Sequence, residues 1–99
     1  MTSRVRVSAA AQRDLAAAKE WYAEQPTPDL DRRFQLELEK VFQQMDGFPT
    51  SFPVVYKDVR RAILHRFPYA VFYHLRSSTP YVLAVVHQAR DPRVWKRRS

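Results

Sequence analysis

The chain has 99 residues, of which 45% are hydrophobic and 13% aromatic, so it is too short for two domains and too apolar for a disordered chain, and we expect one domain over residues 1–99. The absence of cysteine excludes disulfides and thiolate chemistry, and the lack of a secretion signal or of any apolar run near ~20 residues predicts a cytoplasmic protein without a membrane span. A net charge of +7 indicates an acidic or polyanionic partner.

The N-terminal part predicts a short strand followed by a helix. Residues 4–7 alternate polar and apolar side chains, which places two valines on one face of a strand. Ser8 is then the expected N-cap of a helix over residues 9–25. Its apolar stripe at helical spacing consists of Ala11, Leu15, Ala18 and Tyr22.

A second helix is expected to complete a helical hairpin. Thr27 and Pro28 are placed as its N-cap and first helical residue, and Gly47, the only glycine, is expected as a left-handed C-terminal cap. The stripe of this helix consists of Leu30, Phe34, Leu38, Val41 and Met45. The two stripes predict that the hairpin packs through one face.

The rest of the chain predicts three strands and a basic tail. β-branched and aromatic residues fill residues 59–67, 70–76 and 81–88. Their links are short enough only for antiparallel neighbours, with a packed turn at residues 67–69. The fold class is therefore α+β in the order βααβββ, with the helical hairpin packed on one face of a small, mostly antiparallel sheet.

The positive charge is concentrated in the second part of the chain. Residues 57–99 contain ten Lys and Arg but only two Asp and Glu. Most of these cations are arginines, which suit bidentate contacts to phosphate and carboxylate groups. We expect them to gather into a single concave patch opposite the helices.

Several short motifs, in order and spacing, resemble those of the RelE/ParE superfamily. They are Ala10-Ala11-Gln12-Arg13-Asp14-Leu15, Trp21-Tyr22, Arg33-Phe34, Phe48-Pro49, Val59-Arg60-Arg61-Ala62, Arg66-Phe67-Pro68-Tyr69 with Tyr73, Val86-His87 and Arg90-Asp91-Pro92. The superfamily comprises toxins of bacterial type II toxin–antitoxin modules, including plasmid-stabilisation proteins. The resemblance implies a growth-inhibiting toxin that acts by ribosome-dependent mRNA cleavage or by inhibition of DNA gyrase.

The ribonuclease alternative needs groups that move protons and stabilise a phosphorane. The candidate catalytic residues are Arg60, His87 and Arg90, because arginines hold phosphate charge and a histidine titrates near neutrality. Neighbouring strands would bring them together at one sheet edge. The alternative is structural, with Arg60 and Arg90 paired to Asp58 and Asp91.

The chain departs from the RelE-like branch, and its ending His87-x-x-Arg90-Asp91 resembles the ParE-like branch, which implies gyrase as the target. Only Lys57 lies in the region where that branch carries several lysines, and no tyrosine follows Arg90. Trp95 lies where a C-terminal aromatic acid is sought, but an indole cannot donate a catalytic proton; it either stacks on a base or is buried. The candidate target-binding residues are Arg61, Arg66, Arg93 and Trp95.

No cofactor or metal is predicted. His65, His74 and His87 lie on different strands without close spacing, and one glycine cannot build a phosphate-cradling loop. The expected partner is a cognate antitoxin whose acidic segment wraps the hairpin and covers the basic sheet, forming a toxin–antitoxin hetero-oligomer. A third alternative is a non-toxic relative that binds an acidic protein or RNA.

Overall fold

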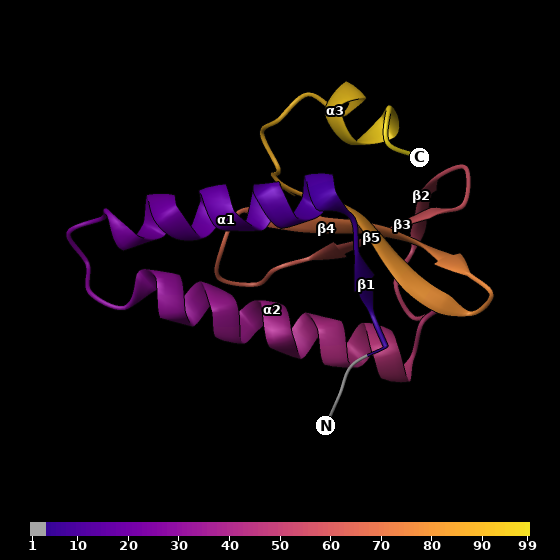
Figure 1. Ribbon diagram of the computed structural model, residues 1–99, viewed down its shortest axis with the longest axis horizontal. Helices are drawn as coiled ribbons and strands as arrows, with labels where there is room; N and C mark the ends of the chain where they lie inside the picture. The colour runs from indigo at the N-terminus through magenta and orange to yellow at the C-terminus, as the bar shows by residue number, and fades with distance from the viewer. Residues whose placement is uncertain (1–3) are drawn as a thin grey trace.

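The computed structural model describes residues 4–99 (Figure 1). Its elements are β1 (Arg6–Val7), α1 (Ala9–Ala23), α2 (Leu30–Gly47), β2 (Val54–Tyr56), β3 (Val59–Ile63), β4 (Tyr69–Arg76), β5 (Thr79–His87) and α3 (Arg93–Lys96). The predicted order of strand, two helices and three strands is confirmed, with β2 and α3 as additions. Residues 1–3, part of the stretch searched for a secretion signal, lie outside the described residues.

The strands form one sheet in the order β1-β5-β4-β3-β2. β1 runs parallel to β5, and the other neighbouring pairs are antiparallel. The link between β4 and β5 is Ser77 and Ser78, which have φ angles of 49° and 68°, as a tight primed hairpin turn requires. The expected mostly antiparallel sheet with two helices on one face is therefore confirmed.

The first helix begins where the sequence predicts. The Ser8 side chain accepts a hydrogen bond from the Ala11 backbone N–H at 3.0 Å, which satisfies one of the free amides of the first turn. The helix ends at Ala23, two residues before the expected end at Gln25. α1 and α2 then lie side by side as a hairpin (Figure 1).

Both expected ends of the second helix are wrong. The N-cap is Asp29 rather than Thr27, and it lies in the left-handed region with φ 64°, because the chain reverses direction between the helices there. Gly47 is the last helical residue and has no positive φ. The chain leaves the helix through Phe48 at φ −136°, so no left-handed glycine is needed.

The core between the hairpin and the sheet contains the predicted stripes. The α2 residues Phe34, Leu38, Val41 and Met45 are buried, whereas Leu15 and Leu30 are half-buried beside them. They pack on Leu64, Val71, Tyr73, Val82 and Val85 of the sheet side. Burial of these apolar side chains is the main stabilising contribution of this layer.

The opposite face of the sheet is covered in part by α3. Trp95 lies 8% exposed and stacks on Phe72 with ring centroids 4.1 Å apart. Tyr56 meets the same indole edge-on at 5.9 Å. The sheet is therefore packed on both faces, which fits the apolar run in β5. Within residues 4–99, no helix combines the length and apolarity needed to cross a bilayer.

Candidate functional site

Cationic side chains gather on the sheet face opposite α1 and α2. Lys57 and Lys96 both place their ammonium groups over the Tyr56 ring, 5.2 and 4.9 Å from its centroid. Arg76 lies 3.9 Å over the Tyr81 ring on the same side of the sheet. We call this surface, with Lys57, Arg61, Arg76, Arg90 and Lys96, the basic face.

A small pocket of about 150 Å³ opens on the basic face. It is lined by Arg61, Ile63, Ala70, Phe72, Val86, His87, Gln88, Arg90, Pro92 and Trp95. The Nε atom of Arg61 is buried there without a hydrogen-bond partner among the described residues. Because Arg61 and Arg90 both line the pocket and a guanidinium binds phosphate or carboxylate in a bidentate manner, the pocket is suited to an anion.

The structure does not bring Arg60 together with His87 and Arg90. Arg60 is paired with Tyr73 of β4, whereas His87 is paired with Tyr69, four residues and about 13 Å away along the strand. The Arg60 Nη1 atom donates to the carbonyls of Thr50 at 3.1 Å and Phe52 at 2.7 Å. Arg60 therefore holds the segment between α2 and β2 instead of facing the pocket.

The neighbouring residue, Arg61, is the arginine that joins Arg90. Successive side chains of a strand point to opposite faces, so Arg60 and Ala62 face the helices while Arg61 and Ile63 line the pocket. The sequence offered no clear signal to distinguish the two, because the buried apolar residues of β3, Val59 and Ala62, lie on opposite faces of the sheet. The structure therefore places Arg61, and not Arg60, beside His87 and Arg90, and a catalytic role for Arg60, His87 and Arg90 stays a prediction.

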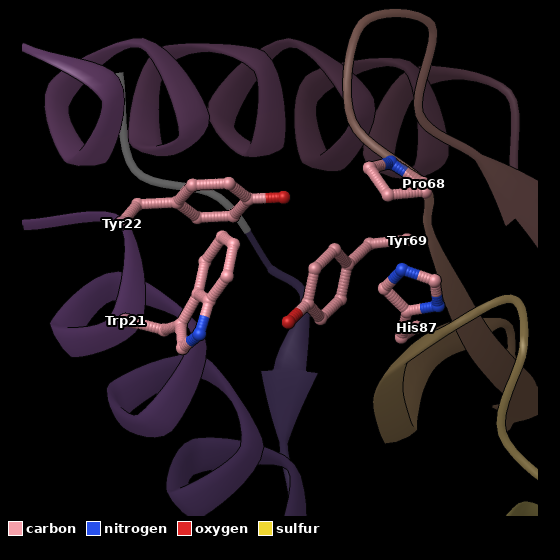
Figure 2. Close-up of a pocket in the computed structure, with 5 residues that line it drawn as sticks. All are labelled: Trp21, Tyr22, Pro68, Tyr69 and His87. Atoms are coloured by element: carbon pink, nitrogen blue, oxygen red, sulfur yellow. The ribbon is translucent and has the colours of Figure 1, made fainter. Parts of the chain in front are cut away.

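A second pocket, of about 250 Å³, lies at the end of α1 (Figure 2). It is lined by Trp21, Tyr22, Pro68, Tyr69 and His87, and we call it the aromatic pocket. The Trp21 and Tyr22 rings meet edge-on at 5.1 Å, and Tyr69 meets the His87 ring edge-on at 5.5 Å. The sequence predicted only a packed turn at residues 67–69 and missed this pocket.

The two phenols of the aromatic pocket are protonated at neutral pH. Burial raises the pKa of Tyr22 and of Tyr69, and the Arg90 guanidinium partly offsets the rise at Tyr69. The Nδ1 atom of His87 accepts a hydrogen bond from the Ala89 backbone N–H at 3.0 Å. In the neutral ring the proton therefore lies on Nε2, and His87 touches both pockets.

The remaining candidate target-binding residues differ in exposure. Arg66 is exposed, and its backbone N–H donates to the Glu37 carboxylate at 3.2 Å. Trp95 is buried in the α3 contact, as one of the two alternatives expected. Contact of either residue with a target stays a prediction.

The acidic residues near the basic face pair differently from expectation. The Asp91 carboxylate is 2.7 Å from Arg93, not paired to Arg90, and hydrogen bonds from Arg93 hold the pKa of Asp91 below its ordinary range. Asp58 lies 3.6 Å from His74. Within the described chain the Arg90 guanidinium forms no ion pair, so its charge is free for a partner.

Across residues 4–99, no three His, Cys, Asp or Glu side chains are grouped to hold a metal ion.

Comparisons with known proteins agree on one family. The family model described as "ParE toxin of type II toxin-antitoxin system, parDE" matches residues 5–92. The chain is 30% identical over 92 residues to Toxin ParE2 of Mycobacterium tuberculosis strains H37Rv and CDC 1551, covering 93% of this chain and 88% of each relative. A solved structure described as "Chromosomal ParDE TA system from P. aeruginosa" matches with a TM-score of 0.72 and 15% identity over 84% of this chain and 92% of that chain. This last likeness shows that the fold is shared.

Proposed function

Because the chain belongs to the ParE toxin family of type II toxin–antitoxin systems, within the RelE/ParE superfamily, we propose that it stops bacterial growth by inhibiting DNA gyrase in the cytoplasm. Family membership also implies a cognate antitoxin as its partner. In this proposal the toxin acts by binding, and the antitoxin neutralises it by covering the surface that contacts gyrase.

The observation that supports binding rather than cleavage is the placement of Arg60. Acid–base cleavage of RNA needs a proton-transfer group and charge-stabilising groups around one phosphate. Two backbone carbonyls hold the Arg60 guanidinium, and the strand position of Arg60 lies about 13 Å along the sheet from that of His87. The lack of a group that joins Arg60 to His87 and Arg90 therefore supports binding over cleavage.

The test measures supercoiling of relaxed plasmid by purified gyrase with increasing amounts of the chain. We expect supercoiling to fall as the chain is added and to recover with equimolar antitoxin. A parallel reaction offers programmed ribosomes and mRNA to the same preparation. Unchanged supercoiling with cleaved mRNA would replace gyrase by the ribosome, and normal growth after induced expression would leave only the non-toxic relative.

Metal-independent, ribosome-dependent mRNA cleavage is the second candidate. It is favoured by the anion pocket, where the unpartnered Arg61 Nε and the unpaired Arg90 guanidinium lie together. If the chain cleaves mRNA, Arg61→Ala and Arg90→Ala should each lower the cleavage rate by about 100-fold. Arg32→Ala, which removes an exposed cation from α2, is the matched control and should leave the rate unchanged.

A further inference from the structure

The aromatic pocket is formed by three separate parts of the chain. Trp21 and Tyr22 lie in the last turn of α1, Pro68 and Tyr69 at the start of β4, and His87 at the end of β5 (Figure 2). Trp21 is 55% exposed, although tryptophan has the largest apolar area of any side chain. An exposed indole on the wall of a pocket is typical of a site that a partner covers.

The walls of this pocket are held in place by ring contacts. The Tyr22 ring meets Phe67 edge-on at 4.9 Å and lies 6.0 Å from Tyr69. Figure 2 shows the Tyr69 ring standing between Trp21 and His87. Because the pocket is already formed, binding of a ligand does not require the free energy of ordering these side chains. Its volume of about 250 Å³ falls below the ~300–1,000 Å³ usual for small-molecule sites, and it fits one large side chain.

The rim of the pocket supplies hydrogen-bond donors. Within residues 4–99, the Trp21 Nε1–H, the Tyr69 hydroxyl and the His87 Nε2–H have no hydrogen-bond partner in the chain. The Arg90 backbone N–H donates to the carbonyl of His87 at 2.9 Å, and the two residues line one pocket, so Arg90 lies close to this rim. A suitable ligand therefore combines an apolar group, which packs on the aromatic walls, with a nearby carboxylate, which accepts hydrogen bonds from the rim and pairs with Arg90.

The charges around the pocket favour a peptide over a nucleic acid. Glu20 and Glu24 are exposed on α1 beside Trp21, and the cations of the basic face other than Arg90 lie on the opposite side of the sheet. A nucleic-acid strand carries a phosphate at every nucleotide and would pass the two glutamates. A peptide can place a carboxylate at Arg90 and neutral residues beside the glutamates.

We propose that the aromatic pocket receives one large apolar side chain from the acidic segment of the cognate antitoxin, and that a neighbouring carboxylate of that segment pairs with Arg90. The inference rests on the proposed function, because it requires an antitoxin that neutralises this chain. Trp21 is then the energetic centre of the contact, as aromatic side chains at the centre of an interface commonly are.

The experiment uses tryptophan fluorescence of the full chain during titration with the purified antitoxin, whose own tryptophans are replaced by phenylalanine. Trp95 is 8% exposed and Trp21 is 55% exposed, so quenching by acrylamide reports mainly on Trp21. We expect saturation with antitoxin to lower the quenching constant about threefold. Calorimetry should show that Trp21→Ala weakens binding about tenfold or more, whereas Trp21→Phe stays within about threefold.

The matched control is Val54→Ala, an exposed apolar residue on β2 at the far edge of the sheet, which should bind within about twofold of the unchanged chain. If the unchanged chain binds antitoxin but quenching and the affinity of Trp21→Ala are unaffected, the pocket inference is overturned and the antitoxin proposal stands. If the unchanged chain does not bind at all, both fall. Shielding of Trp21 by a single-stranded 12-nucleotide DNA, and not by antitoxin, would assign the pocket to nucleic acid and overturn the inference.

Discussion

The Tyr73 side chain links β4 to the segment between α2 and β2. Its ring is fully buried, and its hydroxyl donates to the Pro49 carbonyl at 2.7 Å. Burial raises the pKa of this phenol, although the nearby Arg60 guanidinium opposes the rise. The Arg60 side chain donates to two backbone carbonyls of the same segment. Together, Tyr73 and Arg60 fix the path of the chain into β2.

Tyr73→Phe should lower the free energy of unfolding by about 1–2 kcal/mol, because it leaves the Pro49 carbonyl without this donor and keeps the ring. Urea denaturation at pH 7 measures the change. Tyr81→Phe is the matched control, since Tyr81 is half-buried and its hydroxyl has no hydrogen bond within residues 4–99. Equal losses in the two variants would contradict the assigned contribution of the Pro49 bond.

Alkaline pH should destabilise the fold through the buried phenols. The pKa values of Tyr22, Tyr69 and Tyr73 are raised above 10.0, chiefly by burial, so the folded state favours the neutral form. Their contribution to stability is fully present below the unfolded pKa and is lost as the pH rises through the folded values. Urea denaturation between about pH 8 and 11 should show this decline.

The same pH series tests the assignment to these residues. The decline should be shallower in Tyr73→Phe than in the unchanged chain, because one of the raised pKa values is removed. Lysines titrate in the same range but are common to both proteins. Identical slopes would show that the decline has another source.

Arg60 and Arg61 show how far a candidate site could be predicted from the sequence. The sequence placed both arginines in a strand and placed His87 and Arg90 at the end of another. It did not fix the pairing of β3 with β4, and a shift of one residue moves a side chain to the other face. The sequence therefore identified the basic strands but paired the wrong arginine with Arg90.

At the scale of elements, the ion pair between Arg98 and Asp14 anchors the C-terminal segment to α1 and β5. The Arg98 Nη1 atom lies 2.6 Å from the Asp14 carboxylate and also donates to the Leu83 carbonyl at 3.1 Å. Asp14 accepts a further hydrogen bond from the Val85 N–H at 3.0 Å. The two side chains are 26% and 17% exposed. β1 pairs only with Tyr81 and Val82 of β5, so Asp14 and Arg98 bind backbone groups of β5 that lie beyond the end of β1. The same contact helps to keep α3 on the sheet.

Arg98→Ala should lower the free energy of unfolding by about 1–3 kcal/mol, because it leaves a half-buried carboxylate without its cation. Thermal denaturation and urea denaturation measure the loss. Arg97→Ala removes the same charge from an exposed side chain and should change the free energy by no more than about 0.5 kcal/mol. If both variants lose the same amount, net charge rather than the Asp14 contact is responsible.

Gly47→Ala should stabilise the protein, because Gly47 lies inside α2 without a positive φ and a Cβ there meets no atom within 4 Å. Alanine restricts the unfolded chain more than glycine does, so we expect the free energy of unfolding to rise by about 0.5–1 kcal/mol. Urea denaturation provides the measurement. A loss of stability would show that the helix needs a glycine at its end after all.

The long elements were predictable, as was β1 from the alternation of residues 4–7, whereas β2 and α3 were not. α1, α2 and the three meander strands carry enough residues for a period of 3.6 or 2 to be recognised. β2 has three residues and α3 has four, so neither is long enough for its period to repeat twice. Their formation depends on the tertiary contacts of Tyr56 with Trp95 and of Trp95 with Phe72, and the aromatic pocket likewise requires three distant segments to meet.

At the scale of the whole molecule, the expected single patch of cations forms only in part. The basic face carries Lys57, Arg61, Arg76, Arg90 and Lys96. Other arginines of the same half of the chain contact the chain itself: Arg60 donates to backbone carbonyls, the Arg66 backbone lies beside Glu37, and Arg93 and Arg98 pair with Asp91 and Asp14. The hairpin carries both signs, with exposed Arg32, Arg33 and Lys40 among the acidic residues of α2. An acidic partner is therefore attracted toward one side before any contact forms.

If the proposed antitoxin is acidic, its association with the chain should be directed by the basic face. The rate constant, measured by stopped-flow fluorescence, should fall about tenfold or more between about 50 and 500 mM NaCl. Replacing Lys57, Arg76 and Lys96 by glutamine should lower the low-salt rate and flatten its salt dependence. Replacing Arg32, Arg33 and Lys40 by glutamine removes the same net charge from α2. This variant should change the low-salt rate and its salt dependence much less, because these cations lie beside acidic groups of the hairpin. Equal effects of the two triple variants would show that total charge, and not its position on the sheet, directs the encounter.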